Sequence, residues 1–243
     1  MPSRIDPTTL ERLVPDLVSA HDTTGQDTLK LHLERYAFAA AHITGGAVLD
    51  IACGVGYGSR YLKDRTSAAT VTGVDLSDEA IAYATQLYED SSVTFQTADA
   101  LAFQGGPFDA VISLETIEHL PDPAAFVRHA VRDLLAPGGL FVGSVPVTPS
   151  MDANPYHLSD FTPQSFRRLL ADEGLHEVAA LPQVQPFNPF AVALRTEVRM
   201  QSMRKSLLSY YAKHPRKMLL RLRSTVIDGF NNKYLTLACR KEK

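Results

Sequence analysis

The sequence predicts an α/β protein with a Rossmann-like, mostly parallel, doubly wound sheet of seven strands. Apolar segments of strand length alternate with amphipathic segments of helix length from residue 45 to residue 182. This is the pattern of strands joined by crossover helices. A glycine-rich turn in the segment Ala47 to Arg60, AVLDIACGVGYGSR, follows the first strand and opens a helix. Glycines at such a turn let a ligand approach the backbone closely.

The 243 residues are enough for one domain of this class with a full core. We divide the domain into an N-terminal arm or lid (1–44), a ligand-binding core (45–182), a basic helical insert (183–230) and a last strand with a tail (231–243). Apolar residues recur with helical spacing from Asp27 to His42 and predict a helix within the arm.

The remaining elements follow in order along the chain. We expect strands at 47–51, 69–74, 93–97, 108–114 and 140–145, and helices at 57–65, 78–88, 123–135 and 162–173. Ser77 and Asp122 suit the N-cap position of the second and third of these helices, and Pro123 suits the first helical position. A long polar loop (147–160) separates the fifth strand from the next helix, and further strands are expected at 176–181 and 233–240.

Composition excludes several classes of protein. The net charge is only -3, and no apolar run is long enough to span a bilayer. The start, MPSRIDPTTLERL, lacks the features of a signal peptide. Cys53 and Cys239 are far apart in sequence, and we expect them to be reduced, buried thiols. A cytoplasmic protein is therefore expected.

Polar residues stand where the predicted parallel strands end, which is the edge at which such sheets bind ligands. Asp50 ends the first strand with a carboxylate that suits an ammonium group. Asp75 ends the second with the spacing of a carboxylate that accepts hydrogen bonds from ribose hydroxyls, and Asp99, after the third, could accept from an adenine amino group. Asp75 alone would also suit NAD, and Asp75 and Asp99 could be only turn residues at the strand ends. The glycine turn lacks the Lys-Ser/Thr ending of a triphosphate site.

Five motifs in order resemble the class I S-adenosylmethionine-dependent methyltransferases over about residues 40–180: LDIACGVG, GVDLS, TADA, FDAVISLETIEH and LLAPGGLFV. The resemblance implies that S-adenosylmethionine is the cofactor. Asp50 and the backbone of Gly54-Val55-Gly56 would hold its methionine moiety, Asp75 its ribose, and Asp99 with Ala100 its adenine. The predicted cofactor residues are completed by Ala52, Leu76, Ser113 and Leu114. Ala52 is a departure, because it occupies the position of the family's first glycine.

Candidates for chemistry on the acceptor follow the fourth strand. Glu115, Glu118 and His119 would share one helix face at i, i+3 and i+4, and His157 lies in the later segment NPYHLSDFT. One interpretation is a divalent metal site for Mg, Mn or a similar ion, which would lower the pKa of an acceptor hydroxyl. In a second, His119 or His157 is a general base that Glu115 orients. In a third, these residues are structural.

The metal interpretation has support from resemblance. The Glu-x-x-Glu-His spacing with a later His resembles the metal site of bacterial and plant small-RNA 2′-O-methyltransferases. It is also similar to a segment of quinone-biosynthesis O-methyltransferases.

The predicted acceptor is a hydroxyl of a small polyhydroxylated molecule. NPYHLSDFT and KLHLERYAFAA resemble segments of bacterial methyltransferases that modify sugars in glycans or natural products. Polar residues that could line an acceptor pocket are His32, Arg35, Tyr36, Tyr156 and His157. The alternatives are methylation of the 3′-terminal ribose 2′-hydroxyl of an RNA, and a non-catalytic protein that binds S-adenosylmethionine.

The insert is rich in Lys and Arg from Arg195 to Arg223, with Glu197 as its one acid. It could contact the phosphates of a nucleotide-linked sugar, an anionic membrane that carries a lipid-linked glycan, or only solvent. The pI of about 6.2 and the absence of a recognisable RNA-binding module argue against nucleic acid as the partner. The sequence leaves a homo-oligomer open.

Overall fold

The computed structural model describes residues 13–18, 22–194, 200, 203–204 and 206–242. Its strands are β1 (Gly46–Ile51), β2 (Ala68–Asp75), β3 (Val93–Thr97), β4 (Phe108–Leu114), β5 (Leu135–Pro146), β6 (Leu175–Pro186) and β7 (Asn231–Lys241). Its α-helices are α1 (Thr23–His42), α2 (Tyr57–Arg65), α3 (Asp78–Tyr88), α4 (Pro123–His129), α5 (Pro163–Asp172), α6 (Pro189–Leu194), α7 (Leu207–Lys213) and α8 (Pro215–Asp228).

The seven strands form one sheet in the order β3-β2-β1-β4-β5-β7-β6. β7 runs antiparallel to both of its neighbours, whereas the pairs from β3 to β5 are parallel. The chain therefore winds outward from β1 in one direction and then, from β4, in the other. This confirms the predicted mostly parallel, doubly wound sheet.

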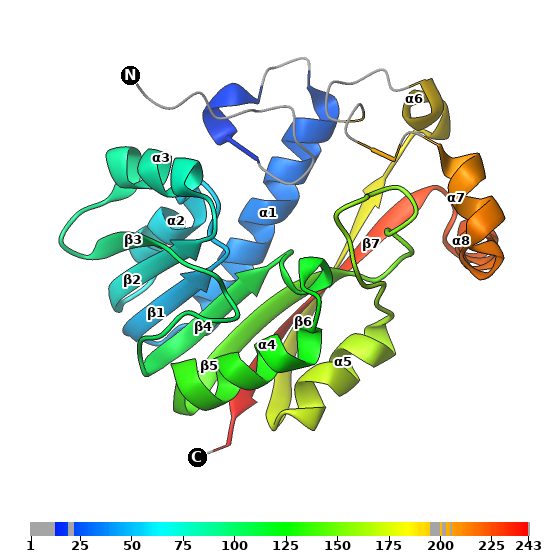
Figure 1. The fold of residues 1–243 in the computed structure, drawn as a ribbon. Coiled ribbons are helices and arrows are strands. Elements are labelled where there is room, and N and C mark those ends of the chain that lie inside the picture. Colours follow the sequence, from blue (N-terminus) through cyan, green and yellow to red (C-terminus); the bar gives the residue numbers. More distant parts are fainter. Residues whose placement is uncertain (1–12, 19–21, 195–199, 201–202, 205, 243) are drawn as a thin grey trace.

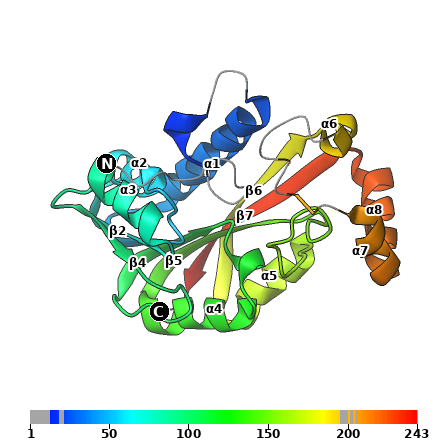
Figure 2. The ribbon, with the colours of Figure 1, turned by 45° about the horizontal axis from the view of Figure 1, so that its top comes forward.

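Helices cover both faces of the sheet, as Figures 1 and 2 show. Neighbouring residues of a strand point to opposite faces. In β1, Leu49 packs in the core cluster beneath α4 and α5, and Val48 packs in the cluster beneath α1 and α2. Both faces of the central strands are therefore buried, which explains their nearly continuous apolar sequences. Ser77 and Asp122 cap α3 and α4, as predicted.

β6 is longer than the strand expected at 176–181 because it pairs with β7 over almost its whole length, from Leu175 to Pro186. Its second half carries Gln183 and Gln185, which fall within the predicted helical insert (183–230). Both side chains are nevertheless buried, because Gln183 hydrogen-bonds α1 at Arg35 and Gln185 bonds it at Thr28. Hydrogen-bond partners on α1 thus allow this strand to bury two polar side chains. The sequence of the strand alone does not indicate this burial.

β5 likewise begins earlier than the strand expected at 140–145 and takes in the Pro137-Gly138-Gly139 turn. The helix expected at 123–135 is α4 followed by a π-helical turn, Ala130–Leu134. Among the described residues, no helix combines the length and the apolar character that crossing a bilayer requires.

The insert between β6 and β7 contains α6, α7 and α8 within its described residues, where one or two helices were expected. Arg195, Arg199 and Lys205 of the insert lie outside the described residues, as do residues 1–12 and 19–21 of the arm. The described part of the arm adds a short 3-10 helix, Pro15–Leu17, next to a fully buried Val14 that packs with Val55 and Ala80. The arm therefore lies against the glycine turn.

Candidate functional site

The glycine turn joins β1 to α2 in a left-handed conformation that few side chains tolerate. The φ angles are +61° at Ala52, +57° at Gly54 and +84° at Gly56. A Cβ on Gly54 would have nothing within 4 Å, so this backbone faces open space, whereas a Cβ on Gly56 would lie 2.5 Å from the Cβ of Ala84. Gly54 therefore leaves room for a ligand, and Gly56 lets α3 pack closely. Ala52, which stands at the position of the family's first glycine, adopts the conformation that glycine favours.

Asp50 lies beneath this turn at 1% exposure. Its Oδ2 accepts hydrogen bonds from Ser59 Oγ at 2.7 Å and from Tyr36 Oη at 3.2 Å. Burial raises the pKa of this carboxyl from 3.8 to about 7, against the lowering effect of the two hydrogen bonds, and the charge of Asp75 adds a smaller increase. Tyr36 comes from α1, so the arm helix supplies part of the environment of the glycine turn.

Asp75 ends β2 beside the same turn. Its Oδ2 accepts from the backbone N of Gly54 and its Oδ1 from that of Ser77, both at 2.9 Å. β3 pairs with β2, so Asp99 follows the neighbouring strand, where its Oδ1 accepts from Leu101 N at 2.9 Å. Between them Leu76 is 72% exposed. A carboxylate, an apolar surface and a second carboxylate thus occupy one edge of the sheet, with Ala100 half-buried next to them.

Ser113 and Leu114 end β4, at the next position along this edge. The Ser113 side chain is fully buried, and among the described residues its Oγ makes no hydrogen bond. It lies on the same face as Val111, in the core beneath α4. Leu114 is half-buried and packs on the α1 side.

Glu115 does not share a helix face with Glu118 and His119, so that prediction was wrong. The 3-10 turn that follows β4 begins only at Ile117, and Glu115 precedes it with φ +51°. Its Oε1 accepts from Ser144 Oγ at 2.7 Å and lies 3.7 Å from Nη1 of Arg35.

Arg35 is the centre of a buried polar wall that sequence reasoning had named only as one of several candidate pocket residues. It is 1% exposed, its Nε donates to Gln183 Oε1 at 2.8 Å, and its guanidinium lies 4.5 Å from the centre of the Tyr234 ring. With Glu115 and Ser144, this wall joins α1 to the ends of β4 to β7. No sequence signal marks Gln183, Ser144 or Tyr234, because their common location arises only from the sheet order.

Glu118, His119 and His157 do come together. One ligand atom from each lies within 4.8 Å of the others, and the two imidazole rings are 4.6 Å apart. Glu118 is fully buried, and its Oε1 is 4.0 Å from Nε2 of His119. The backbone N atoms of Leu158 and Ser159 donate to the Glu118 carbonyl oxygen. This ties the long loop after β5 to the turn after β4, and so brings His157 to the site.

Hydrogen bonds fix both imidazoles by their Nδ1 atoms. Nδ1 of His119 is 3.3 Å from the carbonyl oxygen of Tyr156, and Nδ1 of His157 is 2.7 Å from Ser150 Oγ. Burial, with a further contribution from His119, lowers the pKa of His157 from 6.5 to about 3. His157 is therefore neutral near pH 7, the form in which an imidazole can bind a metal.

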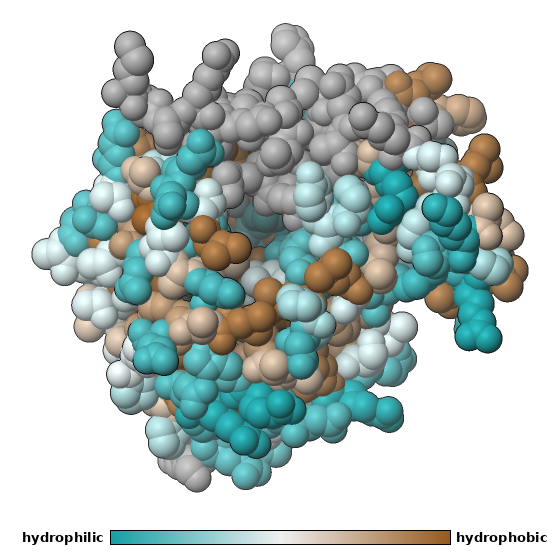
Figure 3. Space-filling model, viewed as in Figure 1, coloured by the Kyte–Doolittle hydropathy of each residue, from teal (hydrophilic) through white to brown (hydrophobic). Residues whose placement is uncertain are grey.

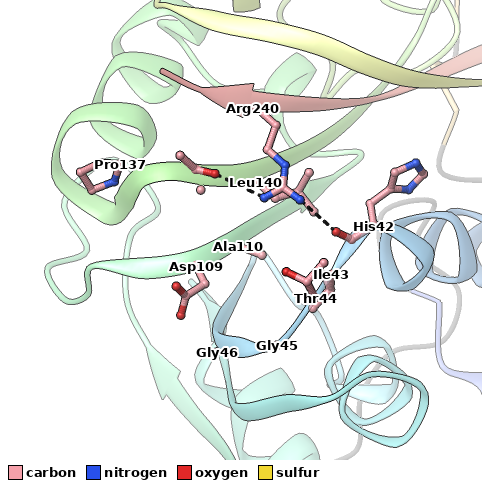
Figure 4. A pocket seen from close by; sticks show the side chains of 12 residues that line it. His42, Ile43, Thr44, Gly45, Gly46, Asp109, Ala110, Pro137, Leu140 and Arg240 are labelled. Atoms are coloured by element: carbon pink, nitrogen blue, oxygen red, sulfur yellow. Dashed lines mark hydrogen bonds between the residues drawn. The ribbon is translucent and has the colours of Figure 1, made fainter. Parts of the chain in front are cut away.

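A separate hollow of about 300 Å³ lies at the opposite edge of the sheet (Figure 4). Gly46, Asp109 and Leu140, near the beginnings of β1, β4 and β5, contribute to its lining. Arg240 closes one side by donating to the carbonyl oxygens of Gly138 and His42. None of the predicted site residues is among the described residues that line it. Parallel sheets bind ligands at the carboxyl ends of their strands, so this hollow is not the candidate cofactor site.

Comparison with known proteins gives a family and a set of relatives. A family model described as a methyltransferase domain matches residues 49–143. A ubiquinone biosynthesis O-methyltransferase of Paraburkholderia xenovorans is 32% identical over 181 residues, which cover 72% of this chain and 74% of that protein. A chloroplastic tocopherol O-methyltransferase of Arabidopsis thaliana is 42% identical over 101 residues, but these cover only 39% of this chain and 28% of that protein.

A ubiquinone biosynthesis O-methyltransferase of Xanthomonas oryzae is 38% identical over 121 residues, and the chain spans about half of its length, 49%. Among solved structures, the YcgJ protein of Bacillus subtilis has a TM-score of 0.65 at 14% identity, over 87% of this chain and 100% of that one. The N-methyltransferase NodS of Bradyrhizobium japonicum has a TM-score of 0.61 at 16% identity, over 89% and 97%. These structures share the fold.

The relative from Paraburkholderia matches nearly three quarters of both chains. The region matched by the family model, residues 49–143, contains the glycine turn and the carboxylates at the strand ends. We conclude that the chain belongs to the class I S-adenosylmethionine-dependent methyltransferases.

Proposed function

We propose that this methyltransferase transfers the methyl group of S-adenosylmethionine to a hydroxyl of a small molecule, with a divalent metal held by Glu118, His119 and His157. The observation that carries the proposal is the convergence of these three side chains, with one ligand atom of each within 4.8 Å of the others, where the turn after β4 meets the loop after β5. β4 is the neighbour of β1, whose glycine turn faces the cofactor edge. The acceptor and the cofactor would therefore meet between these two strand ends.

The cofactor residues have the roles that the motifs imply. Asp50 and the turn at Gly54 hold the methionine moiety, and Asp75 accepts from the ribose hydroxyls. Leu76, Asp99 and Ala100 receive the adenine, for which the 72% exposed side chain of Leu76 offers an apolar surface. The support is that all these groups lie at one edge of the sheet. The cofactor's ammonium would favour the ionised form of Asp50, whose pKa is raised by burial.

The donor set fits a divalent metal. A carboxylate with two imidazoles suits Mn, Fe or Zn, and Mg with fewer imidazole contacts. The carbonyl oxygen of Tyr156 can only accept, so Nδ1 of a neutral His119 donates to it and Nε2 carries the lone pair. Nε2 is the atom that faces Glu118. An outer hydrogen bond that orients a ligating imidazole is typical of metal sites. When bound, the metal would lower the pKa of the acceptor hydroxyl.

Glu115 is not part of this donor set in the proposal. Its carboxylate is directed to Ser144 and Arg35, where it forms part of the polar wall beside the acceptor. In the alternative without a metal, His119 is a better general base than His157, because a group with a pKa of about 3 has little tendency to take a proton near pH 7.

By their names, the relatives point to a different class of acceptor from the sugar that the sequence predicts. They are named for ubiquinone biosynthesis and for tocopherol. We therefore propose a phenolic hydroxyl as the first acceptor class, since a phenol ionises near pH 10 and needs only a modest lowering of its pKa. A saccharide is the second candidate, and the observation that favours it is the buried polar wall of Arg35 and Glu115. The cytoplasmic location stays a prediction.

A methyl-transfer assay with dihydroxybenzoates, glycosides and an RNA with a free 3′ end tests the acceptor class. Transfer to the aromatic diols is expected. Transfer only to the glycosides would replace the first acceptor by the second, and transfer only to the RNA terminus would restore the ribose alternative. Cofactor binding without transfer to any of them would favour the non-catalytic alternative.

The metal is tested with the same assay. Excess chelator should abolish transfer, and Mn²⁺ or Mg²⁺ should restore it. Glu118→Gln and His157→Asn should each lower the rate by about 10- to 100-fold or more, while the affinity for S-adenosylmethionine, measured by calorimetry, stays within about twofold. His176→Asn, at a largely exposed histidine remote in sequence from the cluster, is the matched control. Full activity in excess chelator would remove the metal from the proposal.

A further inference from the structure

Helix α8 packs against the protein through its polar side. The half-buried positions of α8 repeat with helical spacing, and they are Lys217, Arg221, Ser224, Thr225 and Asp228. Lys217 Nζ bonds Asp160 at 2.6 Å, and Arg221 bonds Asp152 at 2.5 Å. Asp152 is 3% exposed, and Tyr211 of α7 donates to it as well. Ion pairs with the loop after β5 therefore hold α7 and α8 in place.

The opposite side of the helix pair is apolar and exposed. On α8 the exposed fractions are 62% for Leu219, 87% for Val226 and 66% for Ile227, and Leu208 of the neighbouring α7 is 86% exposed. Leu220, Leu222 and Phe230 are about half exposed. Hydrophobic side chains gather at the edge of the molecule where Figure 1 places α6, α7 and α8 (Figure 3). An ordinary surface helix has the reverse arrangement, with its apolar side in the core.

The charge on this outward face has a single sign. Arg216 and Arg223, seven residues apart, are exposed on one side of α8, and Lys213, the last residue of α7, is exposed as well. Residues 207–227 contain no Asp or Glu. Exposed leucines with interspersed cations and no acids are the composition of helices that lie in the interface of an anionic bilayer.

We propose that the outward face of α7 and α8 binds the surface of an anionic lipid bilayer. The apolar side chains would enter the boundary between headgroups and acyl chains, and the three cations would contact the lipid phosphates. This goes beyond the proposed methyl transfer and does not depend on its acceptor. A second copy of the chain fits this face less well. A symmetric contact would place the same cations against each other, with no acid within residues 207–227 to pair with them.

The same loop connects this face to the candidate acceptor site. Asp152 and Asp160 form ion pairs with Arg221 and Lys217 of α8. Ser150, two residues before Asp152, hydrogen-bonds His157 through its Oγ. The bilayer-binding face and the histidine cluster are therefore attached to one short segment, 150–160.

Vesicle sedimentation tests the proposal with the full chain. The wild type should sediment with vesicles of phosphatidylglycerol and phosphatidylcholine in equal parts. It should bind vesicles of phosphatidylcholine alone more weakly, by about fivefold for each basic side chain engaged. Raising the salt concentration should weaken binding to the anionic vesicles. Equal binding to both vesicles, or none to either, would overturn the proposal.

Two variants of the face locate the contact. Arg216→Glu/Arg223→Glu should weaken binding at least about 25-fold, which is fivefold for each cation removed. Leu219→Ser/Val226→Ser should weaken it by about tenfold for each side chain. Leu87→Ser/Arg132→Glu, at exposed positions on α3 and on the turn after α4, is the matched control and should bind like the wild type. If the control loses binding as much as the face variants do, the proposal is wrong.

Two further measurements separate this proposal from its alternatives. Analytical ultracentrifugation should show a monomer; a dimer that Leu219→Ser/Val226→Ser dissociates would assign the face to a second copy instead. Calorimetry with S-adenosylmethionine, without vesicles, should give the wild-type affinity for every variant. The vesicle result therefore does not depend on whether the proposed acceptor is correct.

Discussion

Two residues beside the site have a positive φ although they are not glycines. Ala52 opens the glycine turn at φ +61°, and Glu115 follows β4 at φ +51°. Each such conformation costs about 1 kcal/mol or more and persists where the surroundings impose it. At Glu115 the imposing contacts are visible, since its backbone N and its carboxylate both bond Ser144. These two positions flank the place where cofactor and acceptor would meet.

The strain at Ala52 gives a stability prediction. Ala52→Gly should raise the free energy of unfolding by about 0.5–1 kcal/mol, because glycine adopts this φ without a steric penalty. Urea denaturation measures the change. Ala37→Gly, at an exposed position inside α1, is a control of opposite sign and should lower the free energy by about 1 kcal/mol. A loss of stability at both positions would contradict the strain at Ala52.

Asp50 gives a prediction about pH. The folded state raises its pKa from 3.8 to about 7, so between these values the folded protein holds a proton that the unfolded chain has released. The free energy of unfolding contributed by Asp50 must then fall as pH rises from 4 to 7. Relative to Asp50→Asn, the wild type should lose about 2 kcal/mol between pH 5 and pH 7 in urea denaturation of the cofactor-free protein. Parallel pH profiles for the two proteins would refute the raised pKa.

At the scale of elements, α1 is joined to the antiparallel part of the sheet through buried polar contacts as well as the apolar contacts of its core cluster. Arg35 reaches Gln183 of β6, Glu115 after β4 and the ring of Tyr234 in β7. Removing one member of a buried charged group leaves the others without compensation. The position of α1 also affects the candidate site, because Tyr36, the residue after Arg35, donates a hydrogen bond to Asp50.

Arg35→Ala should therefore lower the free energy of unfolding by about 3–5 kcal/mol. The matched control is Arg65→Ala, at an exposed arginine near the ring of Tyr61, which should change stability by less than about 1 kcal/mol. Chemical denaturation of both variants makes the comparison. A small effect at Arg35, similar to that at Arg65, would show that the wall does not hold α1 to the sheet.

The elements differ in how far the sequence could predict them. Helix α3 was predictable with its ends, because Ser77 caps it and its periodicity is strong. The helix expected through Glu115 was not formed, because the backbone turns to positive φ there and no residue type signals this. The second half of β6 was missed because its buried glutamines have partners only on α1.

At the scale of the whole molecule, the two edges of the sheet carry different sets of residues. One edge holds the glycine turn, Asp75, Asp99 and the histidine cluster, which lie at or after the carboxyl ends of β1, β2, β3 and β4. The other edge carries the hollow beside Arg240 (Figure 4). The alternation of strands and helices predicts this cofactor edge from sequence alone.

The buried polar wall around Arg35 could not be predicted in the same way. Its members, Arg35, Gln183 and Tyr234, are separated by up to about 200 residues and meet only because β7 inserts between β5 and β6. The outward apolar face of α8 was also hidden, since a helical pattern does not say which side meets the protein. Which side of α8 meets the protein depends on its ion pairs with Asp152 and Asp160, and these residues lie in a long loop whose conformation the sequence does not predict.

The most direct test of the central claim compares two aspartates at opposite edges of the sheet by calorimetric titration with S-adenosylmethionine. The wild type should bind the cofactor. Asp75→Ala should weaken the affinity for the cofactor at least about tenfold through the loss of charge-assisted hydrogen bonds. Asp109→Ala, beside the hollow at the other edge, should bind the cofactor with an affinity within about twofold of that of the wild type. No heat with the wild type, or a loss at Asp109 without one at Asp75, would contradict a cofactor bound where the parallel strands end.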